Sequence, residues 1–338
     1  MAALIALLLA VLAVGWPSSS APKPKVRASE TEQSDLQLYR DIVGRMRAGE
    51  PYYPVAAEEL RKGGYPLKPF VTFRLPTLAA FYAAVPSIVP VVVEALLALA
   101  VLIAWWRRLQ PHLPFRMLGL ALVLMVAGTA TLVEPVTGMF HESWAALLLA
   151  LMVGLRRPGH ALGAMVAGAL ALSIRETALP MIAAMGALAL LERQWREARG
   201  WLLILSVFAA GMVLHSQMVA AVVQPADLAS PGWSGMLGPR FALKAVSMVS
   251  SAIAVPQWLA LPLILLSLFG WASVATGWAL RASLLLFGYC AMLALFARAD
   301  TFYWALLVAP LSLVGLAFVP RALADLVRAA RGMARQGP

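Results

Sequence analysis

Long apolar runs separated by short polar segments dominate this sequence. The first run covers residues 2–16, and a polar segment at 17–76 follows it. The later runs lie approximately at 78–105, 117–133, 143–155, 161–174, 177–191, 201–223, 257–276, 282–297 and 302–320. Because one helical bilayer crossing takes about 20 mostly apolar residues, the pattern predicts an all-α integral membrane protein with about ten transmembrane helices. The short runs at 143–155 and 161–174 predict tilted helices or a locally thinned bilayer.

The composition supports the same class of protein. Of the 338 residues, 62% are apolar and 13% are charged, and the mean hydropathy is +0.81. A soluble domain has about a quarter charged residues, so this chain lacks the polar residues to cover a water-facing surface. We therefore expect one polytopic membrane domain over 1–338. We attribute the net charge of +11 to basic residues in cytoplasmic loops rather than to nucleic-acid binding.

The first apolar run has two interpretations. The small residues of SSSA after it resemble the cleavage site of a secretory signal peptide. No Lys or Arg precedes the apolar residues, however, and this favours a first helix that is retained.

The basic residues predict an orientation with both termini in the cytoplasm, because short cytoplasmic loops collect Lys and Arg. With the N-terminus inside, the inner loops and the tail at 321–338 hold 13 basic residues: Arg107, Arg108, Arg116, Arg156, Arg157, Arg193, Arg196, Arg199, Arg281, Arg321, Arg328, Arg331 and Arg335. The short outer loops hold 4, namely Arg175, Arg240, Lys244 and Arg298. The remaining segment, 17–76, becomes a long first extracytoplasmic loop.

This outer loop contains a candidate functional carboxylate. Ser34 and Gln37 have the spacing of a capping box, which predicts a short amphipathic helix with Asp35 in its first turn. Such a helix would lie on the extracytoplasmic surface of the membrane that the chain spans. Asp35 serves either as a functional group or only as a favourable charge at the helix start. Farther along, PYYP and GYPLKP predict an extended, turn-rich return to the membrane.

Two further outer loops carry candidate residues. The loop 134–142 contains Glu134, His141 and Glu142, which could bind Mg²⁺ or Mn²⁺ or serve as polar helix ends. Arg175-Glu176-Thr177 predicts a tight polar hairpin between two helices. The Arg175 guanidinium suits either a phosphate or an ion pair with a neighbouring carboxylate. Arg240 and Lys244 lie near the next outer loop and are candidates for the same site.

The order of these segments resembles the GT-C superfamily of polytopic membrane glycosyltransferases, which use polyprenyl-phosphate-linked sugars. The resemblance covers roughly residues 1–190. It rests on the first helix, the long outer loop with SDLQLYRDI, GEPYYP and YPLKPF…RLP, the acidic loop 134–142, and IRET. EPVTGMFHE stands where that family often has a DxD motif. The resemblance implies an extracytoplasmic active site in the inner membrane of a bacterium.

The resemblance also implies residue roles. Asp35 takes the position of the essential early aspartate, which orients or deprotonates the acceptor. Glu134, His141, Glu142 and Tyr39 support the site, and Arg175, Arg240 and Lys244 hold the donor phosphate. A divalent cation could take part, the membrane helices would hold the polyprenyl chain, and membrane lipids are further partners. A lipid-linked donor agrees with the absence of nucleotide motifs such as GxxxxGK[ST] from the sequence.

Two other functions remain open. A transporter or lipid flippase usually shows internal repeats and broken helices at the bilayer midplane, and neither signal is clear in this sequence. A non-catalytic membrane scaffold would tolerate loss of Asp35.

Overall fold

The described chain is helical and divides into two compact units. The computed structural model describes residues 28–132 and 138–334, and no strand occurs among them. Unit 1 contains 101–131 and 234–334 of the described residues, and unit 2 contains 28–100, 132 and 138–233. The predicted first run, 2–16, lies outside the described residues.

The described helices confirm the prediction of an all-helical membrane protein. Four of them are long and apolar enough to cross a bilayer: Ile88–Leu109, Trp195–Ala220, Gly277–Phe296 and the stretch Ala299–Arg331. Further apolar helices are shorter, such as His141–Leu155. A helix of that length rises about 22 Å, whereas the hydrocarbon layer is about 30 Å thick, so length alone does not qualify these shorter helices as full spans.

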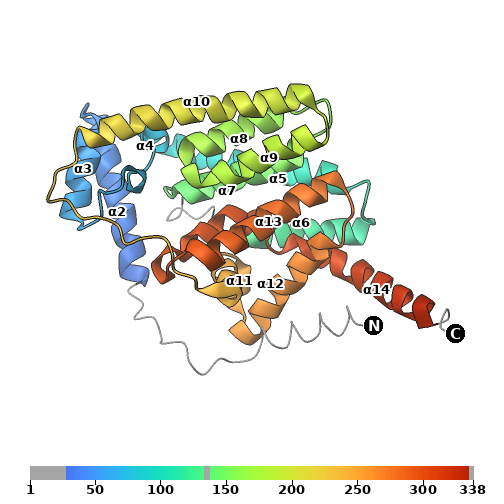
Figure 1. Cartoon of the computed structure of the whole chain (residues 1–338). Coiled ribbons are helices and arrows are strands. Elements are labelled where there is room, and N and C mark those ends of the chain that lie inside the picture. Colours follow the sequence, from blue (N-terminus) through green and yellow to red (C-terminus); the bar gives the residue numbers. More distant parts are fainter. Residues whose placement is uncertain (1–27, 133–137, 335–338) are drawn as a thin grey trace. The chain divides into compact units, whose positions relative to one another are not determined.

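Unit 2 pairs its apolar helices side by side. Its helices are α2 (Ala28–Arg47), α3 (Tyr52–Lys62), α4 (Pro76–Ala84), the first part of α5 (Ile88–Leu109), α7 (His141–Leu155), α8 (Leu162–Ile174), α9 (Leu179–Leu191) and α10 (Trp195–Ala220), with short 3-10 turns η1 (Phe70–Thr72) and η2 (Glu176–Ala178). The closest pairs are α7 with α8 and α9 with α10, and α10 runs along both α8 and α9 (Figure 1).

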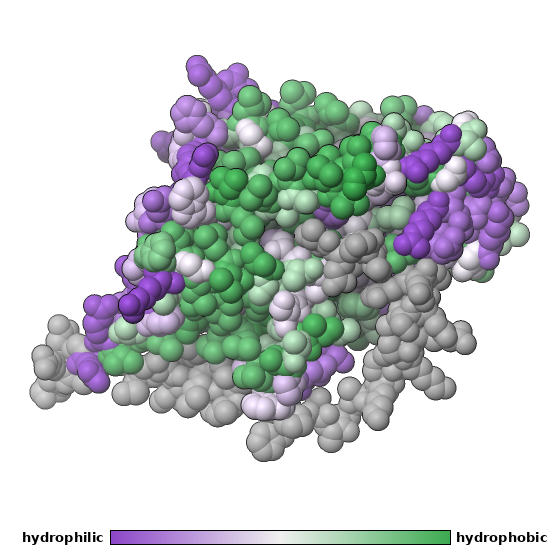
Figure 2. Space-filling view, turned by 180° about the vertical axis from the view of Figure 1, so that it is seen from behind, coloured by the Kyte–Doolittle hydropathy of each residue, from purple (hydrophilic) through white to green (hydrophobic). Residues whose placement is uncertain are grey.

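Large apolar side chains remain exposed on the long helices, as expected of surfaces that face lipid. On α5 they include Ile88, Val91 and Leu96, and on α10 they include Leu202, Leu203 and Val207. Apolar side chains cover much of the surface in Figure 2. Water would penalise such continuous apolar surface, so the pattern fits a hydrocarbon solvent.

Charged side chains lie at the ends of the helices of unit 2. At one end, Arg156 after α7 contacts two carboxylates near the start of α10: Glu192 at 2.7 Å and Glu197 at 3.0 Å. The Arg156 and Glu197 side chains are each 5% exposed. Their mutual charge offsets the desolvation of each. The opposite helix ends carry the candidate site.

Three local predictions for the outer loop are wrong. Helix α2 begins at Ala28, so Ser34 lies inside it rather than capping its start, and Asp35 lies in the interior of a 20-residue helix. The PYYP segment starts α3 instead of an extended strand: Pro51 precedes the helix with extended backbone and Pro54 falls in its first turn, where the missing N–H costs no hydrogen bond. Elsewhere in this segment, Asp41 accepts a hydrogen bond from Gln37, and Arg45 contacts Glu50, Glu58 and Glu59.

Unit 1 contains α6 (Phe115–Thr129), α11 (Gly238–Met248), α12 (Gln257–Ala272), α13 (Gly277–Phe296), the 3-10 segments η3 (Ser251–Ala254), η4 (Ala299–Leu311) and η5 (Val314–Phe318), and α14 (Val319–Ala334). Helix α12 packs against η5 through glycines. A Cβ on Gly270 would lie 1.9 Å from the Gly315 carbonyl oxygen, and one on Gly315 would lie 1.9 Å from that of Ser267. Close backbone approach through small residues is a usual form of helix packing in membranes.

Candidate functional site

A buried ion pair anchors the candidate site in unit 2. Glu142 lies in the first turn of α7, and Arg175 follows α8 with extended backbone that aims it across to α7. The Glu142 Oε1 and Arg175 Nε atoms are 2.7 Å apart, and the two side chains are 1% and 2% exposed. Arg175 also contacts Glu176 on η2. A guanidinium this deeply buried requires carboxylate partners, because an unpaired buried charge is costly.

A second guanidinium, that of Arg74, lies beside this pair. Its Nη2 is 3.8 Å from Glu142 Oε1, and its side chain is 20% exposed. The Tyr52 hydroxyl donates a 2.7 Å hydrogen bond to the Arg74 carbonyl oxygen, which holds the backbone of the segment before α4. The site therefore has one sequestered arginine and one that reaches the surface.

Asp35 contributes a partly buried carboxylate from α2. It accepts a hydrogen bond from the Tyr65 hydroxyl. Burial raises the pKa of Asp35 above its usual value of 3.8, the Tyr65 hydrogen bond and the Arg74 charge oppose that rise, and the Glu142 charge adds to it. This electrostatic coupling places Asp35, Arg74 and Glu142 in one site. A carboxylate with a raised pKa is a better proton acceptor than an ordinary aspartate.

The turn after α3 positions Tyr65 for this hydrogen bond. Gly64 has a φ of +67°, which glycine adopts without strain. A Cβ on Gly63 would lie 2.5 Å from the Tyr65 ring, so glycine also makes room for that ring. The local sequence GGY thus turns the chain back toward α2.

Tyr39 and His141 meet between α2 and α7. Their ring centroids are 5.2 Å apart, and Tyr39 also contacts Phe140 edge-on at 6.4 Å. Burial raises the pKa of Tyr39 to about 12, so its hydroxyl is neutral at physiological pH. His141 is 3% exposed, and neither of its ring nitrogens has a hydrogen-bond partner among the described residues. Buried imidazole nitrogens normally have partners, so His141 retains capacity to donate to and accept from a bound molecule.

A neighbouring aromatic group lies near the C-terminal end of α10. The Tyr53 hydroxyl lies 3.1 Å from His215 Nδ1, and the His215 ring contacts Phe70 at a centroid distance of 6.1 Å. The segment after α10 contacts the end of α3 and the residues that follow it. Arg61 donates hydrogen bonds to Asp227 at 2.7 and 2.8 Å, and Ser230 N donates to the Lys68 carbonyl oxygen. These contacts fix the outer loop onto the helix ends.

The structure brings together five of the residues selected from the sequence: Asp35, Tyr39, His141, Glu142 and Arg175. Glu134 lies outside the described residues. Arg240 and Lys244 lie on α11 in unit 1, and their part in donor binding stays a prediction.

Arg74 and Tyr65 were given no role in the site from the sequence, whereas Glu176 was named in the Arg175-Glu176-Thr177 hairpin and is paired with Arg175. Arg74 stands in the RLP segment before α4, and no acidic residue close to it in the sequence indicated its contact with Glu142.

The described residues do not form a metal site. They contain no group of three or more His, Cys, Asp and Glu side chains that could hold an ion. Glu142, the nearest hard ligand, faces two guanidinium groups instead. The predicted Mg²⁺ or Mn²⁺ dependence therefore stays a prediction that chelation followed by addition of each ion can test.

Comparison with known proteins finds no relative: no family model, no curated protein and no solved structure matches this chain.

Proposed function

We propose that this protein is a membrane glycosyltransferase that moves a sugar from a polyprenyl-phosphate donor to a hydroxyl of an envelope glycan, lipid or protein. The proposal extends the resemblance to the GT-C superfamily. Its main support is the coupling of the Asp35 carboxylate to Arg74 and to the Glu142–Arg175 pair at one end of apolar helices. A general base beside fixed positive charge suits a reaction in which a hydroxyl attacks and a phosphate departs.

The proposed reaction assigns one step to each group. The acceptor oxygen forms a bond to the anomeric carbon, and its proton passes to the Asp35 carboxylate. The bond from that carbon to the donor phosphate oxygen breaks, and the polyprenyl phosphate leaves with the bonding electrons. Arg74, which is more exposed than Arg175, stabilises the growing negative charge on the phosphate.

The buried Glu142–Arg175 pair positions this machinery. It holds the start of α7 against the end of α8, and the His141 ring at the start of α7 contacts the Tyr39 ring. The His141 nitrogens then face the bound sugar or acceptor. In this assignment Arg175 acts mainly through the site's architecture rather than by direct contact with phosphate.

The proposal includes the full topology. Ten helices with both termini in the cytoplasm would place the loop 17–76 and the candidate site on the extracytoplasmic face of a bacterial inner membrane. The single polytopic domain over 1–338 belongs to the same proposal.

Rescue of a deletion strain tests the function. The measured quantity is the profile of glycolipids and surface polysaccharides after expression of wild type, Asp35→Asn or Asp41→Asn. Asp41 lies on the same helix, is exposed and accepts a hydrogen bond from Gln37, so it is a matched control. We expect wild type and Asp41→Asn to restore a lost glycan and Asp35→Asn to leave it missing while reaching the membrane at the same level. A full profile with Asp35→Asn, as a transporter or scaffold would allow, rejects the mechanism.

A further inference from the structure

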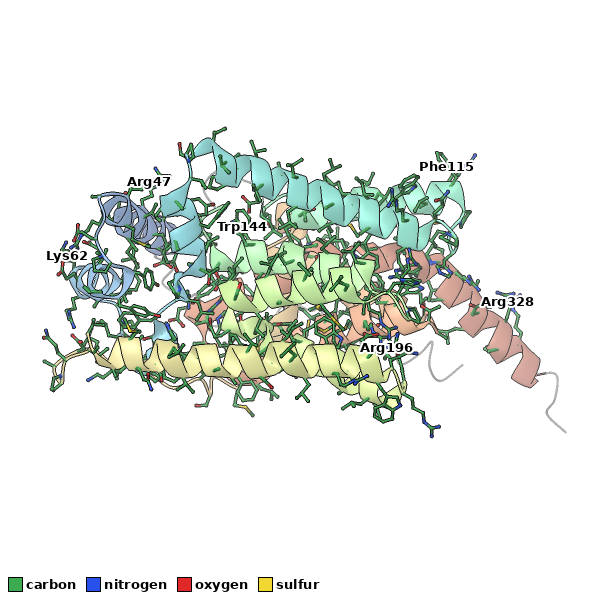
Figure 3. All side chains as sticks on the ribbon, turned by 90° about the horizontal axis from the view of Figure 1, so that it is seen from above. Arg47, Lys62, Phe115, Trp144, Arg196 and Arg328 are labelled. Atoms are coloured by element: carbon green, nitrogen blue, oxygen red, sulfur yellow. The ribbon has the colours of Figure 1, made fainter. Side chains whose placement is uncertain are left out.

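Helix α14 separates its residues onto two opposite faces. With about 100° of rotation per residue, one face holds Leu323, Leu326, Val327 and Ala330, and the opposite face holds Arg321, Arg328 and Arg331. The Arg321 and Arg328 side chains are 82% and 74% exposed. Arg328 projects from the helix in Figure 3. Such a basic, amphipathic helix has the pattern of one that lies on a membrane surface.

Helix α14 begins directly at an aromatic cluster that marks one end of unit 1. Trp271 at the end of α12 contacts Trp105 on α5 at a centroid distance of 5.5 Å and Phe318 at 5.3 Å. Trp278 at the start of α13 completes the cluster. Phe318 is the residue before α14. These four side chains are buried, so the cluster fixes the start of α14 to the ends of α12 and α13 and to the last turns of α5.

The same end of unit 1 carries additional positive charge. Arg107 lies in the last turn of α5, Arg116 lies in the first turn of α6, and both are exposed. Phe115, the first residue of α6, is 89% exposed and lies toward the same end as Arg328 in Figure 3. Asp325 pairs with Arg328 and lies 3.9 Å from Arg321, so one acidic residue offsets part of the charge of three arginines on α14. The end as a whole remains basic.

We propose that α14 lies in the membrane–water interface and binds the headgroups of anionic phospholipids. Its apolar face enters the headgroup–acyl boundary beyond the part of α14 that packs on α12 and η5. Its arginines then contact phosphate oxygens, because a surface of anionic lipids attracts basic side chains. The choice of lipid rather than protein as the partner rests on charge complementarity and on the position of α14 at the end of apolar helices. This inference is independent of the proposed transferase activity.

Depth-dependent quenching in nanodiscs tests the inference on the full-length protein. In a Cys290→Ser background, Leu326→Cys on the apolar face and Ala324→Cys on the basic face each carry an environment-sensitive fluorophore. Ala324 is exposed and only two residues away, so it is the matched control. In nanodiscs containing phosphatidylglycerol and brominated lipid, we expect several-fold stronger quenching at position 326 than at position 324. Equal quenching at both positions would show that the apolar face does not enter lipid, and would overturn the proposal.

Lipid charge is tested by two further arms. In nanodiscs of phosphatidylcholine alone, or at high salt, quenching at position 326 should fall, because screening weakens exposed charge pairs. The combined change R321Q, R328Q and R331Q should lower quenching in phosphatidylglycerol to the phosphatidylcholine level, whereas Lys62→Gln on α3 should not. The salt arm needs no arginine variant, so the test stands if the triple variant folds poorly. Quenching that ignores both lipid charge and salt would contradict the binding of anionic headgroups.

Discussion

The Nε atom of Arg175 and the Oε1 atom of Glu142 lie 2.7 Å apart, and both side chains are buried almost completely. Each residue stands at a helix end, one after α8 and the other in the first turn of α7. The pair therefore joins two helices, and Glu142 also lies near Arg74.

Breaking this pair should destabilise the protein. Glu142→Gln removes one carboxylate from the buried Arg175 guanidinium, which also contacts Glu176, and removal of one member of a buried pair costs about 3–5 kcal/mol. We expect a lower midpoint of thermal unfolding in detergent and less protein in the membrane. Glu58→Gln, which changes a largely exposed partner of Arg45, should cost less than about 1 kcal/mol. Equal stability of the two variants would contradict a supporting role for the Glu142–Arg175 pair.

Tyr65 should set the acidic limb of the pH profile. The base form of Asp35 is its carboxylate, and its pKa is raised, so transfer activity is present above that pKa and is lost as the pH falls through it. Tyr65→Phe removes a hydrogen bond that lowers the pKa, and a hydrogen bond to a charged group is worth about 1.5–3 kcal/mol. The limb should therefore move to higher pH by about one to two units.

Initial rates of transfer across the acidic range measure this shift. Tyr53→Phe is the control, because Tyr53 hydrogen-bonds with His215 rather than with Asp35. An unmoved limb in Tyr65→Phe, or an equal shift in both variants, would show that Asp35 does not titrate as the base.

Close backbone contact in unit 1 should make Gly315 intolerant of a side chain. A Cβ at this position would lie 1.9 Å from the Ser267 carbonyl oxygen, so Gly315→Ala must separate η5 from α12. A Cβ on Gly288 of α13 would meet nothing within 4 Å, which makes Gly288→Ala a matched control. We expect Gly315→Ala to lower the unfolding temperature by several degrees and Gly288→Ala to leave it nearly unchanged. The reverse order would place the helix contact elsewhere.

Cysteine accessibility should report the proposed orientation. In a Cys290→Ser background, Lys62→Cys on α3 and Gln194→Cys before α10 both introduce reactive thiols at the ends of unit 2. A membrane-impermeant maleimide added to intact cells should label position 62, and label position 194 only after the membrane is opened. Labelling of position 194 from outside would invert the topology.

The apolar runs of the sequence were sufficient to locate most of the apolar helices. Continuous apolar runs predicted α7, α8 and α9 within a few residues, because a helix surrounded by other helices or by hydrocarbon is apolar all round. The run at 78–105 instead breaks into α4 and α5 around Pro86, where proline removes a helical hydrogen bond. Helix α3 escaped prediction because PYYP predicts an extended, turn-rich segment, although Pro51 only precedes the helix and Pro54 stands in its first turn.

The candidate site was predictable only for residues that the alternation of loops across the membrane places on the same side. Counting membrane crossings put Glu142 and Arg175 on one side, and the structure brings them into contact. Nothing local in the sequence indicated that Arg74 lies near Glu142, or that Tyr65 returns to Asp35 from 30 residues away. Such contacts depend on how the outer loop folds back, which neither composition nor spacing encodes.

The pool of lipid-linked donor tests the central claim most directly. Mass spectrometry of lipid extracts measures polyprenyl-phosphate-linked sugars in a deletion strain rescued by wild type, Asp35→Asn or Asp41→Asn. A transferase that lacks its base leaves its donor unused, so we predict that one such lipid accumulates in the deletion strain and with Asp35→Asn, and returns to the wild-type level with Asp41→Asn. A donor pool that is the same with Asp35→Asn as with wild type, at equal protein levels, would contradict the proposed function.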